Sequence, residues 1–232
     1  MIMNFFDAVY CTHLPAQRER KRLMEIEFKK VGLNKVEFIH APVPPFNFVS
    51  NLYNRNASGE FGCSLSGCKA IIHGISRNAK NVLVFDDDVY FVDDALAILD
   101  KGLKQLRGKD WSVLYLGGNL LIRTRLLSPN LLRTGDRFDG SYTYCINGKY
   151  LLDFVDYWMY GITHGLYKGK KGNWSPYDVI LSYFAKKTNA GYCIYPPIVK
   201  PLAGMSTVDK LDHPIEKLTA RIENNWARNL IK

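Results

Sequence analysis

One short segment constrains the fold more than any other part of this 232-residue chain. Val82-Leu83-Val84-Phe85 is a continuous apolar run, which is typical of a β-strand that is covered on both faces. Three consecutive aspartates, Asp86, Asp87 and Asp88, follow it directly. The chain must therefore bury a strand in the middle of a layered structure and still accommodate three adjacent carboxyl groups where that strand ends.

Segments with helical spacing alternate with other strand-like segments along the rest of the chain. The apolar periodicity predicts strands at 6–10, 36–39, 82–85, 111–116, 142–146 and 192–195, and helices at 15–31, 63–76, 92–106, 149–157 and 176–186. This alternation predicts an α/β fold, a sandwich of helices around a mainly parallel sheet. We expect residues 1–232 to form a single domain, with a C-terminal helix at about 214–231 packed on it. The alternative is that this amphipathic helix lies on an anionic membrane surface.

Charge and cysteine content narrow the class of protein. Lys and Arg number 31 against 22 Asp and Glu, and the resulting charge of +9 favours anionic partners such as nucleotide phosphates. No recognised nucleic-acid motif occurs and the aromatic residues do not interleave with the basic clusters, so we expect no nucleic-acid partner.

The five cysteines form no CxxC pair, which favours free thiols in a reducing compartment. Without a signal peptide or a long apolar stretch, the expected location is cytoplasmic, with at most peripheral membrane contact.

The three aspartates are the strongest chemical signal in the sequence. In open α/β sheets, ligands bind beyond the carboxyl ends of the strands, which is where these residues lie. Neighbouring carboxylates raise one another's pKa unless a cation neutralises them, and hard oxygen ligands suit Mg²⁺ or Mn²⁺. Because side chains alternate along an extended chain, Asp86 and Asp88 share a face and Asp87 points away. We therefore predict Asp86 and Asp88 as the metal-binding pair.

Two classes of enzyme place aspartates in this position. In phosphatases of the haloacid dehalogenase type, Asp86 would be the nucleophile and Asp88 the acid/base, and Gly135-Asp136-Arg137-Phe138-Asp139 would imitate the later metal motif. In nucleotide-sugar transferases, an Asp-x-Asp motif holds a divalent cation against the donor diphosphate. A complete βαβα unit precedes the aspartates, which argues against the phosphatase. A non-catalytic nucleotide-sugar-binding protein is a third alternative.

Six segments across about residues 7–208 resemble, in order and spacing, the motifs of glycosyltransferase family 25, which includes lipopolysaccharide and collagen galactosyltransferases. The segments are His13-Leu14 with Arg20; Val36-Glu37-Phe38-Ile39-His40-Ala41; Ser58-Gly59-Glu60-Phe61-Gly62-Cys63-Ser64-Leu65-Ser66; Val82-Leu83-Val84-Phe85-Asp86-Asp87-Asp88-Val89; Ser175-Pro176-Tyr177-Asp178 with Leu181; and Tyr195-Pro196-Pro197-Ile198-Val199 with Ser206. Three positions depart from the family pattern: His13 replaces Asn, Gly67 replaces His, and Asp86 replaces Glu.

The resemblance implies a GT-A-type Rossmann-like fold, a UDP-sugar donor, Mn²⁺ (or Mg²⁺) and transfer with inversion. The sugar would be galactose or glucose, and the acceptor hydroxyl would belong to a glycan, a glycolipid or a hydroxylated protein. Inversion requires a general base that takes the proton of the acceptor. Asp178 is the first candidate and Glu60 the second. The alternative for Asp178 is that it caps the N-terminus of its helix.

The remaining candidate residues concern the donor and the metal. Those predicted to bind the donor are His13, Arg20, Gly59, Ser66 and Asp87. Gly59 and Gly62 are expected to permit a tight backbone turn into a helix that begins at Cys63 and attracts phosphate. His213 is predicted as a further metal ligand. A surface arginine at Arg20 and a loop histidine at His213 are the alternatives.

Overall fold

The computed structural model describes residues 5–43, 57–122, 124–134, 138–139, 142–164, 166, 175–202, 204–205, 212–213 and 215–231. A nine-stranded sheet in the order β15-β7-β8-β11-β5-β10-β3-β1-β2 organises these residues. Its strands are β1 (Ala8–His13), β2 (Glu37–His40), β3 (Asn81–Phe85), β5 (Val113–Tyr115), β7 (Thr124–Ser128), β8 (Leu131–Arg133), β10 (Thr143–Asn147), β11 (Gly191–Ile194) and β15 (Leu230–Ile231).

The strand pairings show that the sheet is mainly parallel in direction. β3 and β5 both pair antiparallel with β10, and β7 and β11 both pair antiparallel with β8. The other four pairs are parallel, so β8 and β10 run one way and the remaining seven strands run the other. β3 lies between β1 and β10 in the interior of the sheet, as its continuous apolar run requires.

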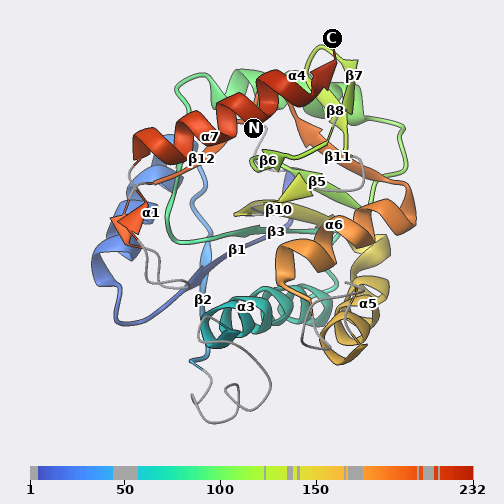
Figure 1. The fold of residues 1–232 in the computed structure, drawn as a ribbon. Helices are drawn as coiled ribbons and strands as arrows, with labels where there is room; N and C mark the ends of the chain where they lie inside the picture. Colours follow the sequence, from blue (N-terminus) through green and yellow to red (C-terminus); the bar gives the residue numbers. More distant parts are fainter. Residues whose placement is uncertain are drawn as a thin grey trace.

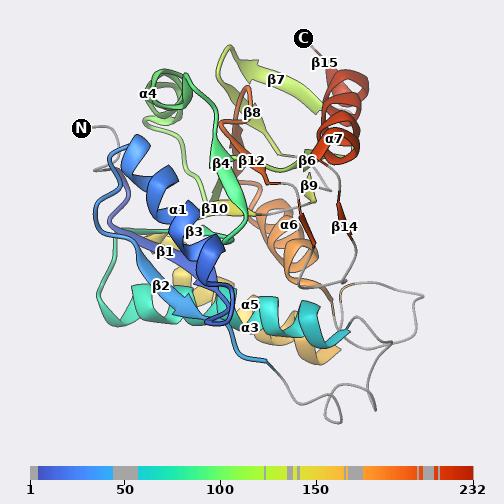
Figure 2. The same cartoon turned by 90° about the vertical axis from the view of Figure 1, so that its left-hand side faces the viewer.

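Helices cover both faces of the sheet. One face carries α1 (Arg18–Lys30) and α4 (Ala95–Leu106), and the other carries α3 (Ala57–Ser76), α5 (Leu151–His164) and α6 (Tyr177–Thr188) (Figure 1, Figure 2). A short 3₁₀ turn, η2 (Gly148–Tyr150), leads into α5. The Rossmann-like α/β/α sandwich with a mainly parallel central sheet is therefore confirmed.

Residues of β3 contribute alternately to the two cores of the sandwich. Leu83 and Phe85 pack in the core that contains Phe28 of α1, whereas Val82 and Val84 pack in the core on the side of α3. All five residues of β3 are buried. Burial of an aliphatic or aromatic side chain stabilises the fold by roughly 1.5–3 kcal/mol. β3 is thus packed on both faces, and the aspartates directly follow this buried strand.

Several short elements were not predicted. They are β4 (Val89–Phe91), β6 (Asn119–Leu120), β7, β8, β9 (Phe138–Asp139), β12 (Val199–Pro201), β13 (Gly204–Met205) and β14 (Asp212–His213). Most contain two or three residues, which is too few for an alternating pattern to emerge. Because β4 pairs with β12, the helix predicted at 92–106 begins only at Ala95.

The C-terminal helix α7 (Ile215–Asn229) packs on the rest of the described chain. Ile222 and Trp226 are buried, and Trp226 lies edge-on to Phe138 at 6.1 Å between ring centroids. The indole nitrogen Nε1 of Trp226 donates to the carbonyl oxygen of Gly118 at 3.1 Å, and Asn229 Nδ2 donates to that of Leu120 at 2.9 Å. Ile222 and Trp226 of α7 therefore face protein.

Two expectations about the chain as a whole can be compared with the structure. All five cysteines are free thiols, as predicted, and four of them are buried. Among the helices in the described ranges, none combines the length and the apolar character needed to cross a bilayer.

Candidate active site

The parallel pairing of β1 with β3 brings side chains of β1 next to Asp86, Asp87 and Asp88. We call these aspartates and the residues around them the acidic site. Cys11 lies opposite Phe85 in this register, so the next residues along β1, Thr12 and His13, come beside Asp86 and Asp87. Thr12 Oγ1 donates to Asp86 Oδ1 at 3.1 Å. The ring nitrogen Nδ1 of His13 lies 2.9 Å from Asp87 Oδ2. The register between β1 and β3 thus decides which side chains meet the aspartates. This register cannot be read from either sequence segment alone.

Arg20 of α1 provides the cation of the site. Its Nη1 donates to Asp87 Oδ1 at 3.0 Å and to Asp88 Oδ2 at 2.9 Å. The Asp87 side chain is 12% exposed, whereas that of Asp88 is 35% exposed. Asp87 is therefore enclosed between His13 and Arg20, and Asp88 is the more exposed of the two carboxylates.

The prediction that Asp87 points away from Asp88 is wrong. Asp87 and Asp88 both bind the same guanidinium nitrogen, so they do not point to opposite sides. The reason is that β3 ends at Phe85, and strand alternation applies only within extended backbone. Asp87 is nevertheless more enclosed than Asp88, and the metal pair Asp86 and Asp88 stays a prediction.

The electrostatics of the site show an excess of negative charge. The pKa of Asp86 is raised to about 7, mainly by burial and then by the neighbouring Asp88 and Asp87 carboxylates, whereas the hydrogen bond from Thr12 and the charge of Arg20 act in the opposite direction. Burial also raises the pKa of Asp88, while Arg20 acts in the opposite direction. Among the described residues, Asp86 forms no ion pair. A bound cation would relieve this arrangement.

The raised pKa of Asp86 predicts how stability depends on pH. A carboxyl group whose folded-state pKa lies above its unfolded value of about 3.9 contributes full stability below that value and loses it as pH rises through about 7. Asp86→Asn, which stays neutral and can still accept from Thr12, should therefore exceed the wild type in free energy of unfolding at about pH 8 but not at about pH 4. Urea denaturation in EDTA measures both values. An equal difference at the two pH values would contradict the shift.

Two helix N-termini bring further acids to the aspartates. Burial raises the pKa of the Cys63 thiol, and four nearby carboxylates raise it further, those of Asp86, Asp178, Asp88 and Glu60 in decreasing order. Cys63 and Glu60 belong to α3 and Asp178 to α6. Both predicted general bases and both predicted metal-binding aspartates therefore lie within electrostatic range of the Cys63 thiol.

Asp178 is not the N-cap of its helix, so the alternative interpretation of this residue is wrong. The N-cap of α6 is Pro176, and Asp178 is the second residue of the first turn. Its Oδ1 accepts from the backbone nitrogen of Val179 at 2.8 Å. A carboxylate here interacts favourably with the helix dipole. Its role as general base stays a prediction.

A buried tyrosine pair holds the first turn of α6 against the sheet. The hydroxyl groups of Tyr144 and Tyr177 are hydrogen-bonded, and their ring centroids lie 5.6 Å apart. The pKa of both hydroxyls is raised, mainly by burial and in part by Asp86 and Cys63, so the pair adjoins the acidic site. Because Tyr177 directly precedes Asp178, the pair determines where Asp178 stands.

Gly67 makes room for this tyrosine pair. A Cβ atom at Gly67 would lie 2.6 Å from Cζ of Tyr177, closer than real Cβ contacts. Gly67→Ala should therefore lower the free energy of unfolding by about 1–3 kcal/mol, because overpacking against the buried Tyr177 ring outweighs the gain in helix propensity. Lys69→Ala, at an exposed position of the same helix, is the matched control and should change it by less than about 0.5 kcal/mol. Equal thermal stability of the two variants would refute the contact.

Two of the predicted donor-binding residues, Gly59 and Ser66, lie within α3. Gly59 lies inside α3, which begins six residues before Cys63, so the predicted turn into the helix is wrong. Tertiary packing outweighs the low helix propensity of two glycines. Ser66 is buried and donates to the carbonyl oxygens of Gly62 and Cys63 within its own helix. His213 lies in β14, and its side chain falls outside the described residues.

Sequence reasoning missed Thr12, Cys63, Tyr144 and Tyr177 as residues of the site. Thr12 could have been found by pairing the first and third strands in parallel, which places it opposite Asp86. The two tyrosines carried no local signal, because their contact joins β10 to α6. The phosphatase motif at 135–139 lies mostly outside the described residues, apart from Phe138–Asp139 in β9.

Comparisons with known proteins find likeness in structure alone. No family model matches the chain, and no curated protein matches it. Among solved structures, a glycosyltransferase involved in glycosylation of the major capsid of PBCV-1 shares 16% identity at a TM-score of 0.35 over 66% of this chain. Mannose-1-phosphate geranyltransferase from Thermus thermophilus shares 11% at 0.39 over 80%, and A197 from STIV shares 11% at 0.41 over 89%. The aligned part covers 65%, 58% and 97% of those chains, so it spans less than two thirds of the first two.

Proposed function

We propose that this protein is a metal-dependent, inverting glycosyltransferase of the GT-A type that moves a hexose, galactose or glucose, from a UDP-sugar to an acceptor hydroxyl. The observation that carries the proposal is the acidic pair Asp86 and Asp88 at the carboxyl end of β3. Their pKa values are raised, and Asp178 and Glu60 stand nearby. Ligands of open α/β sheets bind at this edge.

The carboxylates fit a divalent cation. Among the described residues, no group of three or more histidine, cysteine, aspartate or glutamate side chains is arranged to hold a metal. Mg²⁺ and ions like it are commonly held by one or two carboxylates together with substrate phosphates and water, so Asp86 and Asp88 would suffice. His213 would be a further ligand. Such a cation would neutralise the charge that develops on the departing UDP.

Residues of the chain itself would position the donor and take the proton of the acceptor. Arg20 and His13 hold Asp87 and so fix the backbone between the two metal-binding aspartates. Arg20 also donates to Asp88, and from there it would meet the diphosphate. Asp178 takes the proton of the acceptor hydroxyl as that oxygen attacks the anomeric carbon, with Glu60 as the alternative base. The buried tyrosine pair keeps Asp178 in place.

A donor panel tests the proposal without knowledge of the acceptor. UDP-galactose, UDP-glucose and UDP-N-acetylhexosamines are incubated with the purified protein in Mn²⁺ or in EDTA, and UDP release into water is measured. Mn²⁺-dependent release from one donor would support the proposal and name the sugar. No release and no Mn²⁺-dependent UDP binding would refute it. Magnesium-dependent phosphate release from an aryl phosphate would instead identify a phosphatase.

A further inference from the structure

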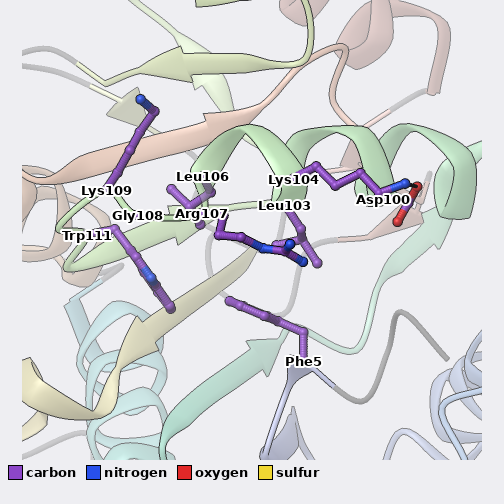
Figure 3. A pocket seen from close by; sticks show the side chains of 9 residues that line it. All are labelled: Phe5, Asp100, Leu103, Lys104, Leu106, Arg107, Gly108, Lys109 and Trp111. Carbon is purple, nitrogen blue, oxygen red and sulfur yellow. Dashed lines mark hydrogen bonds and ion pairs between the residues drawn. The ribbon is translucent and has the colours of Figure 1, made fainter.

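A pocket lies at the end of the sheet opposite the aspartates. It has a volume of about 340 Å³ and is lined by the last turns of α4, the loop that follows this helix, Phe5 and Trp111 (Figure 3). Phe5 precedes β1 and Trp111 precedes β5, two strands that run in the same direction as β3. The pocket is therefore at the amino ends of the strands, whereas Asp86 follows the carboxyl end of β3.

The floor of this pocket, which we call the α4 pocket, is apolar and aromatic. The rings of Phe5 and Trp111 lie 5.8 Å apart at an angle of 32°. Leu103 and Leu106 complete the floor from α4. Its volume falls within the range of about 300–1,000 Å³ that is typical of small-molecule sites. Such a floor favours a flat or aliphatic body.

The rim of the α4 pocket is cationic. Lys104 pairs with Asp100 at 2.6 Å, which cancels the one acid of the lining. Arg107 and Lys109 form no ion pair within the described part of the chain. Figure 3 shows the Arg107 guanidinium above the Phe5 ring, whereas the amino group of Lys109 points away from Phe5. Arg107 thus offers a cation at the rim of the pocket whose floor is apolar.

Capping of α4 does not account for these cations. Basic side chains often lie near a helix C-terminus, where they interact with the last carbonyl groups. In α4, however, the backbone nitrogen of Arg107 already donates to the Leu103 carbonyl at 3.1 Å, and that of Lys109 donates to the Leu106 carbonyl at 3.0 Å. Gly108, at φ +77°, permits this turn. The Arg107 side chain remains available to a ligand.

We propose that the α4 pocket binds a small amphipathic anion, with an aromatic or aliphatic body over Phe5 and Trp111 and one carboxylate, phosphate or sulfonate on Arg107. A guanidinium forms charge-assisted hydrogen bonds with such groups. Asp100 is held by Lys104 and does not oppose the anion. This site stands independently of the transferase activity, because no residue of the acidic site lines it.

Binding of anilinonaphthalene sulfonate to the full chain tests the proposal, with phenylnaphthylamine as the uncharged probe of the same apolar body. We expect saturable one-site binding of the sulfonate that Arg107→Gln weakens about tenfold, the loss that follows from one charge-assisted hydrogen bond. Lys101→Gln, at an exposed position of α4 that does not line the pocket, is the matched control and should bind as the wild type does. Arg107→Gln should leave the binding of phenylnaphthylamine unchanged.

Competition with other ligands shows whether the sulfonate occupies the α4 pocket and which apolar body the pocket prefers. UDP with Mn²⁺ should not displace the sulfonate, whereas dodecanoate or naphthoate should, and the stronger of the two names the preferred body. The proposal is overturned if Arg107→Gln binds like Lys101→Gln, if UDP displaces the probe, or if neither carboxylate does. Arg107 is exposed, so its replacement should leave the unfolding temperature unchanged, which a thermal melt of each variant verifies.

Discussion

Asp88→Asn is expected to lower metal-dependent UDP release about 100- to 1,000-fold, one of the two largest effects that we predict for a single substitution. The change removes one negative charge from the pair proposed to hold the cation, while the asparagine oxygen can still accept from Arg20. The amide is therefore expected to preserve the fold and to remove mainly the affinity for the cation. Release assays over a range of Mn²⁺ concentrations measure the effect.

Asp93→Asn is the matched control for this experiment. Asp93 is exposed and lies five residues along the chain, so the substitution changes net charge equally without entering the site. The control should release UDP as the wild type does. If Asp88→Asn also retained wild-type release at every Mn²⁺ concentration, Asp88 would have no part in metal binding.

Asp178→Asn should abolish sugar transfer while UDP binding stays intact, with a loss of about 100- to 10,000-fold in kcat. The amide cannot take a proton from the attacking oxygen, but it keeps the volume of the side chain and its position in the first turn of α6. UDP affinity measured by calorimetry separates the loss of a base from the loss of donor binding. Release of UDP into water reports kcat when the acceptor is unknown.

Asp156→Asn, on the exposed face of α5, controls for the change in charge. Full activity in Asp178→Asn would exclude this residue as the base and transfer the role to Glu60, which Glu60→Gln would then test. Loss of UDP affinity together with kcat would show that Asp178 supports the site rather than the proton transfer. The two variants are therefore expected to change different quantities. Asp88→Asn should change the dependence of UDP release on Mn²⁺ concentration, whereas Asp178→Asn should lower kcat.

The buried strand β3 and the acids that follow it were predictable because the signals are local. A run of four apolar residues identifies a strand covered on both faces, and the structure buries Val82, Leu83, Val84 and Phe85 completely or nearly so. The aspartates follow in sequence, so their location at the carboxyl end of that strand required no knowledge of the rest of the chain. Helices of twelve or more residues were predicted for the same reason, since their periodicity extends over several turns.

The partners of those acids were not predictable from local patterns. Thr12 and His13 reach Asp86 and Asp87 only because β1 and β3 pair in one particular parallel register. The two-sided alternation predicted for the aspartates is wrong because the strand ends at Phe85, and strand ends depend on the pairing with β1 and β10. The contact between Tyr144 and Tyr177 joins residues that are 33 positions apart.

Local patterns were thus enough to establish the alternation of strands and helices, the free thiols, and three carboxyl groups after a buried strand. The folded chain alone reveals that Asp87 is enclosed by His13 and Arg20, that Asp88 is more exposed than Asp87, and that Asp178 and Glu60 both act electrostatically on the Cys63 thiol. These two kinds of information differ because apolar periodicity is a property of neighbouring residues along the chain. The charge balance and burial of an ionisable group depend instead on segments brought together from distant parts of the chain.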